Sequence, residues 1–114
     1  MTPINRFNIL ASLLLTVQFV AAGTTGKLVG KVTSKETGKP LIGANVMVEG
    51  TPLGSAADMD GNYLILQISP GTYSVRFTMI GYQDLVVSGV RIKVDLTTRI
   101  NGDLPESVVG LDEV

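Results

Sequence analysis

Residues 72–80, TYSVRFTMI, decide the fold class. Apolar side chains occupy every second position of this stretch, at Tyr73, Val75, Phe77 and Met79. Successive side chains of a β-strand point to opposite faces, so this alternation places one face in a core and the other in solvent. The stretch is therefore predicted to be a half-buried strand.

The same alternation recurs before and after this stretch. Three further sets of inward residues are expected on strands: Leu28, Gly30 and Val32; Ala44, Val46 and Val48; Leu96, Thr98 and Ile100. Two more strands are predicted over residues 61–67 and 83–94, and the second is apolar on both faces in places. A strand of that kind is expected to be central in its sheet. No stretch after residue 26 keeps a helical period, so the class is all-β.

Three segments rich in turn-forming residues separate these strands, at residues 37–40, 58–62 and 69–71. Each combines residues that tolerate a positive φ with residues that fix φ, and each is predicted to close a hairpin. Many short strands at this spacing, without helices to cover a parallel sheet, favour a two-sheet sandwich of six or seven strands.

Residues 1–22 have the three-part layout of a secretory signal peptide. Arg6 and the free amine precede the apolar residues 9–20, and Ala21 and Ala22 follow ahead of Gly23. The apolar run of about 14 residues is shorter than the ~20 residues that a membrane anchor needs. We expect this leader to be cleaved after Ala22 and the chain to be exported.

The composition excludes several classes of function. Nine Lys and Arg residues nearly balance ten Asp and Glu residues, so no basic field is available to hold a nucleic acid. The absence of cysteine removes disulfides, thiolate metal sites and thiol nucleophiles. The absence of histidine removes the side chain that most often acts as general base or metal ligand. We therefore expect neither an enzyme nor a cofactor.

Residues 58–61, DMDG, resemble the start of a calcium-binding loop, because alternate carboxylates precede a glycine. If Asp58 and Asp60 took loop positions 3 and 5, positions 1 and 12 would be Ala56 and Gln67. Ala56 has no ligating side chain, and Gln67 cannot supply the bidentate carboxylate that position 12 requires. A β-turn is the favoured interpretation, and no metal site is expected.

A series of short motifs resembles the carboxypeptidase regulatory-like family over residues 28–104. In chain order they are residues 30–32 (GKV), 38–46 (GKPLIGANV), 50–51 (GT), Gly54, 58–63 (DMDGNY), 71–73 (GTY) and 80–82 (IGY). The resemblance implies a seven-stranded transthyretin-like, or prealbumin-like, β-sandwich over residues 23–104.

The resemblance also implies roles for single residues within that sandwich. Gly43 and Gly61 would lie where a side chain obstructs a bend. Tyr63, Tyr73 and Tyr82 would pack their rings and keep their hydroxyls at the rim.

The family resembled is a structural module that often precedes the plug and barrel of TonB-dependent outer-membrane receptors. Residues 105–114 are expected to form an extended tail, and its last residues, Leu111, Asp112, Glu113 and Val114, resemble the start of a TonB box. Such a box adds as an extended strand to the edge of the TonB C-terminal domain. A mildly acidic tail without a partner is the alternative.

The sequence thus predicts a non-catalytic periplasmic module of a TonB-dependent receptor of a Gram-negative bacterium, which assists nutrient uptake. Its expected partners are proteins: a TonB-type energy-coupling protein, or the receptor's own plug and barrel at the outer membrane. The alternative is a free-standing secreted or cell-surface module that binds a protein or a glycan. A hydroxyisourate hydrolase of the transthyretin type is close to excluded, because its site depends on histidines.

Overall fold

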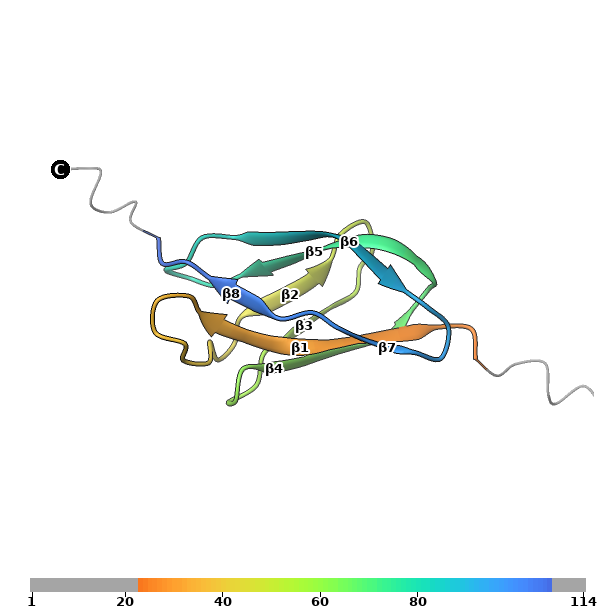
Figure 1. The fold of residues 1–114 in the computed structure, drawn as a ribbon, viewed down its shortest axis with the longest axis horizontal. Coiled ribbons are helices and arrows are strands. Elements are labelled where there is room, and N and C mark those ends of the chain that lie inside the picture. Colours follow the sequence, from red (N-terminus) through yellow and green to blue (C-terminus); the bar gives the residue numbers. More distant parts are fainter. Residues whose placement is uncertain (1–22, 108–114) are drawn as a thin grey trace, which may run out of the picture.

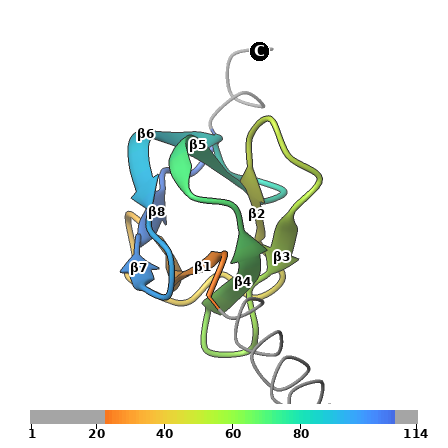
Figure 2. The same ribbon diagram turned by 90° about the vertical axis from the view of Figure 1, so that its right-hand side faces the viewer.

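The computed structural model describes residues 23–107, which form two β-sheets packed face to face (Figures 1 and 2). The first sheet contains β1 (Gly26–Ser34), β4 (Asn62–Ile68), β7 (Thr97–Arg99) and β8 (Gly102–Leu104). The second contains β2 (Asn45–Val48), β3 (Gly54–Ala56), β5 (Gly71–Thr78) and β6 (Leu85–Ile92). These described residues include no helix long and apolar enough to span a bilayer. The predicted leader and residues 111–114 lie outside them.

The first sheet is built around β1, which pairs antiparallel with β4 on one side. On its other side, β7 runs parallel to the first half of β1 and β8 runs parallel to the second half. β7 and β8 therefore lie end to end and share one strand position. The second sheet has the order β3-β2-β5-β6 and is antiparallel throughout. The predicted seven-stranded all-β sandwich is confirmed, since the eight segments fill seven positions.

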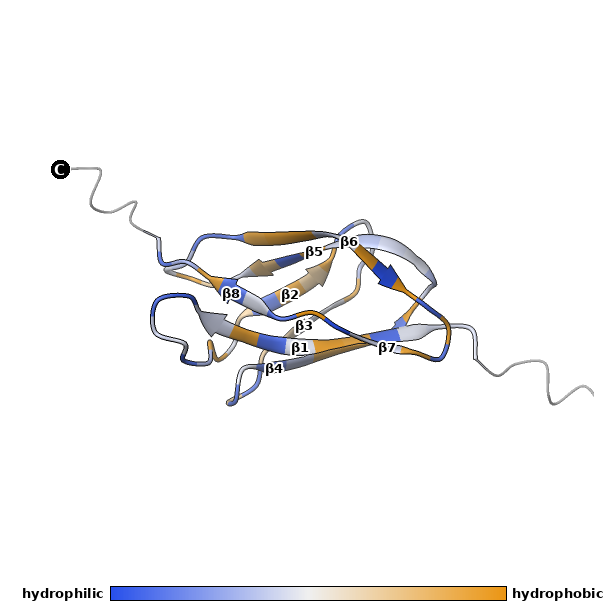
Figure 3. Cartoon of the chain, viewed as in Figure 1, coloured by the Kyte–Doolittle hydropathy of each residue, from blue (hydrophilic) through white to orange (hydrophobic). Residues whose placement is uncertain are grey.

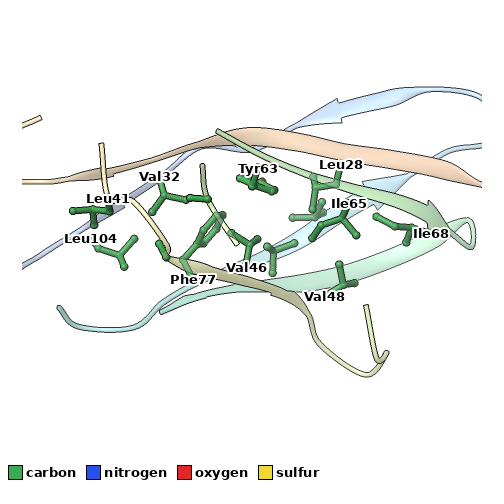
Figure 4. Close-up of a cluster of buried hydrophobic side chains, with 14 of the residues drawn as sticks. Leu28, Val32, Leu41, Val46, Val48, Tyr63, Ile65, Ile68, Phe77 and Leu104 are labelled. Carbon is green, nitrogen blue, oxygen red and sulfur yellow. The ribbon is translucent and has the colours of Figure 1, made fainter. Parts of the chain in front are cut away.

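The core lies between the sheets and is made by the alternate residues that the sequence pattern places inward (Figures 3 and 4). Every second residue of β1 is buried, as are Val46 and Val48 of β2 and Val75 and Phe77 of β5. The Phe77 ring meets the ring of Tyr63 edge to face, with centroids 5.8 Å apart. This contact joins the two sheets.

Two glycines make room for these aromatic rings. Gly30 pairs with Tyr63 across the β1–β4 ladder, and a Cβ on Gly30 would lie 2.8 Å from Cε2 of that ring. Gly102 of β8 faces the other ring, and a Cβ there would lie 2.9 Å from Cγ of Phe77. Glycine within a strand marks a close approach of this kind. Both positions therefore depend on the absence of a side chain.

The predicted strand over residues 83–94 is present as β6, but its expected central place is wrong. β6 is an edge strand of the second sheet. Leu85 and Val87 are half-buried on its inner side, whereas Val86 is 40 % exposed. An apolar residue on the outer face of an edge strand gives the same sequence pattern as a strand that is buried on both faces.

The strand expected around Leu96, Thr98 and Ile100 is shorter than its alternation suggests. Only residues 97–99 form β7, and Leu96 is 53 % exposed. Asp95 adopts a positive φ of 60° and turns the chain just before this strand. The first residue of the expected strand therefore belongs to the turn.

The three predicted turns are present. The prediction that they close hairpins is confirmed for the first, where Thr33 and Pro40 form an antiparallel bridge, and is wrong for the other two. Gly38 donates to the Ser34 carbonyl at 2.8 Å, and Gly61 donates to the Asp58 carbonyl at 2.9 Å. Each turn nevertheless leads from one sheet to the other, between β1 and β2, β3 and β4, or β4 and β5. The consecutive antiparallel neighbours are β2–β3 and β5–β6. The turn-forming residues determine that the chain reverses direction at these points. They do not determine which sheet the next strand joins.

Candidate partner-binding site

The predicted TonB-box residues lie outside the described part of the chain, but the segment that leads to them is described. After β8 the chain runs along the β5–β6 loop. Gln83 donates its main-chain N–H to the Pro105 carbonyl at 2.8 Å, and Ser107 donates to the Gly81 carbonyl at 2.9 Å. Between these bonds, Glu106 pairs with Tyr82 as an antiparallel bridge. The chain is therefore held to the sandwich as far as Ser107.

Side chains reinforce this exit segment on both sides. The Gln83 amide donates to the Glu106 carbonyl at 3.4 Å, and the Glu106 N–H donates to a Glu36 carboxylate oxygen at 3.1 Å. The loop that receives the segment turns at Gly81, which has a φ of +87°. In the sequence, the IGY motif at residues 80–82 served only to indicate the family. In the structure it forms the turn whose Gly81 carbonyl binds the N–H of Ser107, where the chain leaves the sandwich.

Three loops lie together at this end of the sandwich, over residues 35–44, 57–61 and 79–84, and we call it the loop end (Figure 1). They are neighbours because Asn45, where the first loop enters β2, pairs with both Ala56 and Thr78. Each loop exposes one large apolar side chain: Ile42 by 54 %, Met59 by 78 % and Ile80 by 96 %. The chain therefore leaves the sandwich beside exposed apolar side chains.

The Asp58 carboxylate is used inside its own turn. Its Oδ1 accepts hydrogen bonds from the main-chain N–H groups of Asp60 and Asn62, both at 2.9 Å. An aspartate that bonds to the following backbone in this way stabilises a tight turn. The predicted β-turn over residues 58–62 is thus observed, and Asp58 has a structural role in it.

The opposite end of the sandwich carries an open pocket of about 300 Å³. Its lining residues are Thr25, Gly26, Lys27, Leu66, Gln67, Asp95 and Leu96. Within residues 23–107, Gln67 and Asp95 are the non-glycine residues with a positive φ, 60° in each case. Gln67 lies where the β1–β4 register shifts, opposite Lys27. Sequence reasoning missed this pocket, because neither residue stands in a recognisable turn motif.

Tyr63 is the buried ionisable group of the core. Its hydroxyl donates to the Ile100 carbonyl at 2.6 Å, and its side chain is almost fully buried. Burial raises the pKa of Tyr63, and the nearby charge of Arg99 offsets this only in part. The prediction of a hydroxyl at the rim is wrong for Tyr63, since the hydroxyl satisfies a carbonyl inside the sandwich. The Tyr73 hydroxyl is exposed and donates to the Ser69 carbonyl at 2.6 Å.

Arg76 forms an ionic cluster on the outer face of the second sheet. Its Nε lies 3.1 Å from Glu49 and its Nη1 lies 3.2 Å from Asp84. The hydrogen bond to Glu49, followed by the charge of that carboxylate, raises the pKa of Arg76. Because both contacts are exposed, they contribute little to stability. Arg76 is already paired, so it is poorly suited to bind an anion.

Comparison with known proteins places these features in context. Residues 28–114 match the family model described as CarboxypepD_reg-like domain. The TonB-dependent receptor SusC of Bacteroides thetaiotaomicron is 33% identical over 106 residues, which are 93% of this chain and 9% of the receptor. The TonB-dependent receptor P3 of Formosa agariphila is 32% identical over 82 residues, which are 70% of this chain and 8% of that receptor.

The chain spans less than a tenth of the length of these two receptors. Among solved structures, a type II cohesin–X–dockerin complex from Acetivibrio cellulolyticus has a TM-score of 0.57 at 20% identity. The match covers 68% of this chain and 52% of that chain. This likeness supports the fold alone.

Proposed function

The chain belongs to the CarboxypepD_reg-like domain family, and from this premise we propose that it serves as a non-catalytic N-terminal module of a TonB-dependent outer-membrane receptor. The observation that carries the proposal is the match to the receptor SusC, which extends over 106 residues at 33% identity. That length exceeds the sandwich, so the likeness reaches beyond a shared fold.

The positions of the two ends of the described chain support a module with one neighbouring segment at each end. The described chain enters the sandwich ahead of β1 at one end and leaves it after β8 at the other (Figure 1). A leader would therefore attach at one end and the tail would leave at the other. Seven residues follow Ser107, and a fully extended chain of that length reaches at most about 25 Å. Leu111 is four residues beyond Ser107, so it can extend at most about 14 Å from the sandwich.

In the proposed mechanism, residues 1–22 direct export to the periplasm, and the sandwich then holds the start of the tail in place. Leu111, Asp112, Glu113 and Val114 add as a strand to the edge of a TonB-type protein. Main-chain hydrogen bonds supply affinity in such an addition, and alternate side chains set the register. The proposal needs no cofactor and no reacting side chain.

Disulfide trapping tests the proposed contact, because the chain contains no cysteine of its own. Asp112→Cys in the full chain is expected to form a mixed disulfide with a cysteine placed on the edge strand of a TonB C-terminal domain. Adding Leu111→Pro removes a main-chain donor and should abolish trapping, whereas adding Leu111→Ala should preserve it. Ser88→Cys on β6 is the exposed control. Equal trapping through residues 88 and 112, or trapping that survives the proline, would contradict the proposal.

The receptor setting itself is tested by reading the encoding DNA past the codon for Val114. Continuation of the frame into a plug and a barrel is expected. A stop codon at that point, with no barrel gene beside it, would contradict the receptor role and favour a free-standing module.

A further inference from the structure

Gly23, the first residue that the structure describes, lies directly against the carboxylate of Asp95. A Cβ on Gly23 would lie 2.9 Å from Oδ1 and 3.0 Å from Cγ of Asp95, and nearer still to Oδ2. Gly23 also has a φ of +74°, which favours glycine. From these contacts and standard bond lengths, the Gly23 nitrogen lies within about 5 Å of the carboxylate.

Main-chain hydrogen bonds hold Gly23 and Asp95 close together. The Asp95 N–H donates to the Thr25 carbonyl at 3.0 Å, and the Lys27 N–H donates to the Leu96 carbonyl at 3.1 Å. The start of the sandwich is thus bonded to the β6–β7 turn. Asp95 adopts its positive φ in that turn, a conformation that Asp and Asn tolerate better than most residues. The positions of Gly23 and Asp95 are therefore fixed together.

Within the part of the chain that the structure describes, no ion pair includes the Asp95 carboxylate. Within residues 23–107, the ion pairs are those of Arg76, at the outer face of the second sheet. Lys27 lines the same pocket as Asp95, and Lys93 lies two residues before it, yet neither forms an ion pair with it there. The exposed carboxylate of Asp95, beside Gly23, is suited to bind an ammonium group.

The expected cleavage site supplies such a group at this point. A signal peptidase would hydrolyse the peptide bond between Ala22 and Gly23. Water adds its hydroxyl to the Ala22 carbonyl to give a carboxylate, and the Gly23 nitrogen takes up protons to become an α-ammonium group. We propose that Asp95 binds the α-ammonium group of Gly23, so that removal of the leader completes an ion pair that fixes the new N-terminus in the pocket.

This inference rests on the proposed export and is independent of the receptor role. In the unprocessed chain the Gly23 nitrogen is a neutral amide and cannot form the pair. After processing, the chain would begin at the sandwich itself, with no N-terminal extension.

The first test is to export the full chain with its own leader from a Gram-negative host, and to determine the N-terminal residue by sequencing and intact mass. Gly23 is expected to be that residue. In the processed protein labelled with ¹³C-glycine, NMR titration gives the pKa of the α-amino group. We expect a value at least about half a unit above the ordinary range of 7.7–8.0.

Two variants test whether the Asp95 carboxylate is the cause of a raised α-amino pKa. Asp95→Asn keeps the shape and tolerates the same backbone conformation, and it should return the α-amino pKa to its ordinary range. Asp103→Asn, on β8, should leave the raised value unchanged. A different N-terminal residue, or the same α-amino pKa with and without Asp95, would overturn the inference. The second outcome would leave export intact, and neither outcome bears on disulfide trapping at residue 112.

Discussion

At the scale of single residues, Tyr63 links three parts of the sandwich through its ring and its hydroxyl. Its ring packs edge-on against Phe77 and opposite Gly30, and its hydroxyl satisfies the Ile100 carbonyl. That carbonyl lies between β7 and β8, where the chain passes from one half of β1 to the other. A buried carbonyl without a donor is costly, so this one hydrogen bond supports the passage.

Tyr63→Phe should lower the free energy of unfolding by about 1–3 kcal/mol, because it leaves the Ile100 carbonyl unsatisfied while keeping the ring. Urea unfolding at pH 7 measures this loss. Tyr73→Phe removes a hydrogen bond of the same 2.6 Å length from an exposed site and should cost under about 1 kcal/mol. An equal or larger loss for Tyr73→Phe would contradict the role assigned to burial.

The same hydroxyl predicts a loss of stability in alkali. A tyrosine in the unfolded chain ionises with a pKa of about 10, and burial raises the pKa of Tyr63 in the folded state. Above pH ~10 the folded chain therefore holds a proton that the unfolded chain has released. Stability from this group is fully present below pH ~10 and falls with rising pH, by up to about 1.4 kcal/mol per unit.

Urea unfolding of the wild-type chain and of Tyr63→Phe at pH 8 and pH 11 measures this effect. The advantage of the wild-type chain should shrink at the higher pH, since the variant lacks the group. All other residues are the same in the two proteins, so their contributions cancel in the comparison. A gap between the two proteins that stays constant with pH would refute the prediction.

At the scale of elements, the turns between the sheets depend on glycines for two different reasons. Gly43 and Gly61 have nearly equal φ values, +81° and +80°. A Cβ on Gly43 would meet no atom within 4 Å, whereas one on Gly61 would lie 2.7 Å from the Val32 carbonyl oxygen and 2.9 Å from Cβ of Pro40. The turn at Gly43 requires only a residue that adopts a positive φ. The turn at Gly61 also requires a residue without a side chain.

Gly43→Ala and Gly61→Ala therefore form a matched pair. Both should lose about 1 kcal/mol or more from the positive φ, and Gly61→Ala should lose appreciably more because β1 and the following loop must shift. Thermal or urea unfolding of the two variants gives the difference. Equal losses would show that the turn at Gly61 relaxes and that its close packing has no energetic weight.

At the scale of the whole molecule, the two sheets depend on one shared core. Phe77 is fully buried within it on β5 and faces Gly102 of β8 as well as Tyr63 of β4 (Figure 4). A single domain of this size has a total stability of only about 5–15 kcal/mol. The loss of one such ring is therefore a large part of the whole.

Phe77→Ala should cost about 3–5 kcal/mol and unfold both sheets in one transition. Leu64→Ala, on the outer face of β4 where the side chain is 49 % exposed, should cost under about 1 kcal/mol. Circular dichroism and tyrosine fluorescence followed through the same urea titration check both values. Separate transitions for the two probes would contradict a shared core.

The sequence alone determined the fold class and most of the inward residues. Alternation at Leu28 and Val32, at Val46 and Val48, and at Val75 and Phe77 predicts the buried faces that the structure shows. This succeeds because the side-chain period of a strand is a local property of the backbone. The series of glycine and tyrosine motifs likewise indicated the family, and the turn at residues 58–62 followed from local hydrogen bonding.

Only the tertiary structure decided which strands are neighbours. It placed β6 at an edge, divided one strand position between β7 and β8, and made two of the three expected hairpins into connections between sheets. It also brought Gly23 to Asp95, and Ser107 to Gly81, across long stretches of sequence. Pairing of distant segments depends on the complementary surfaces of the whole core, and local alternation has the same form whichever partner a strand finds.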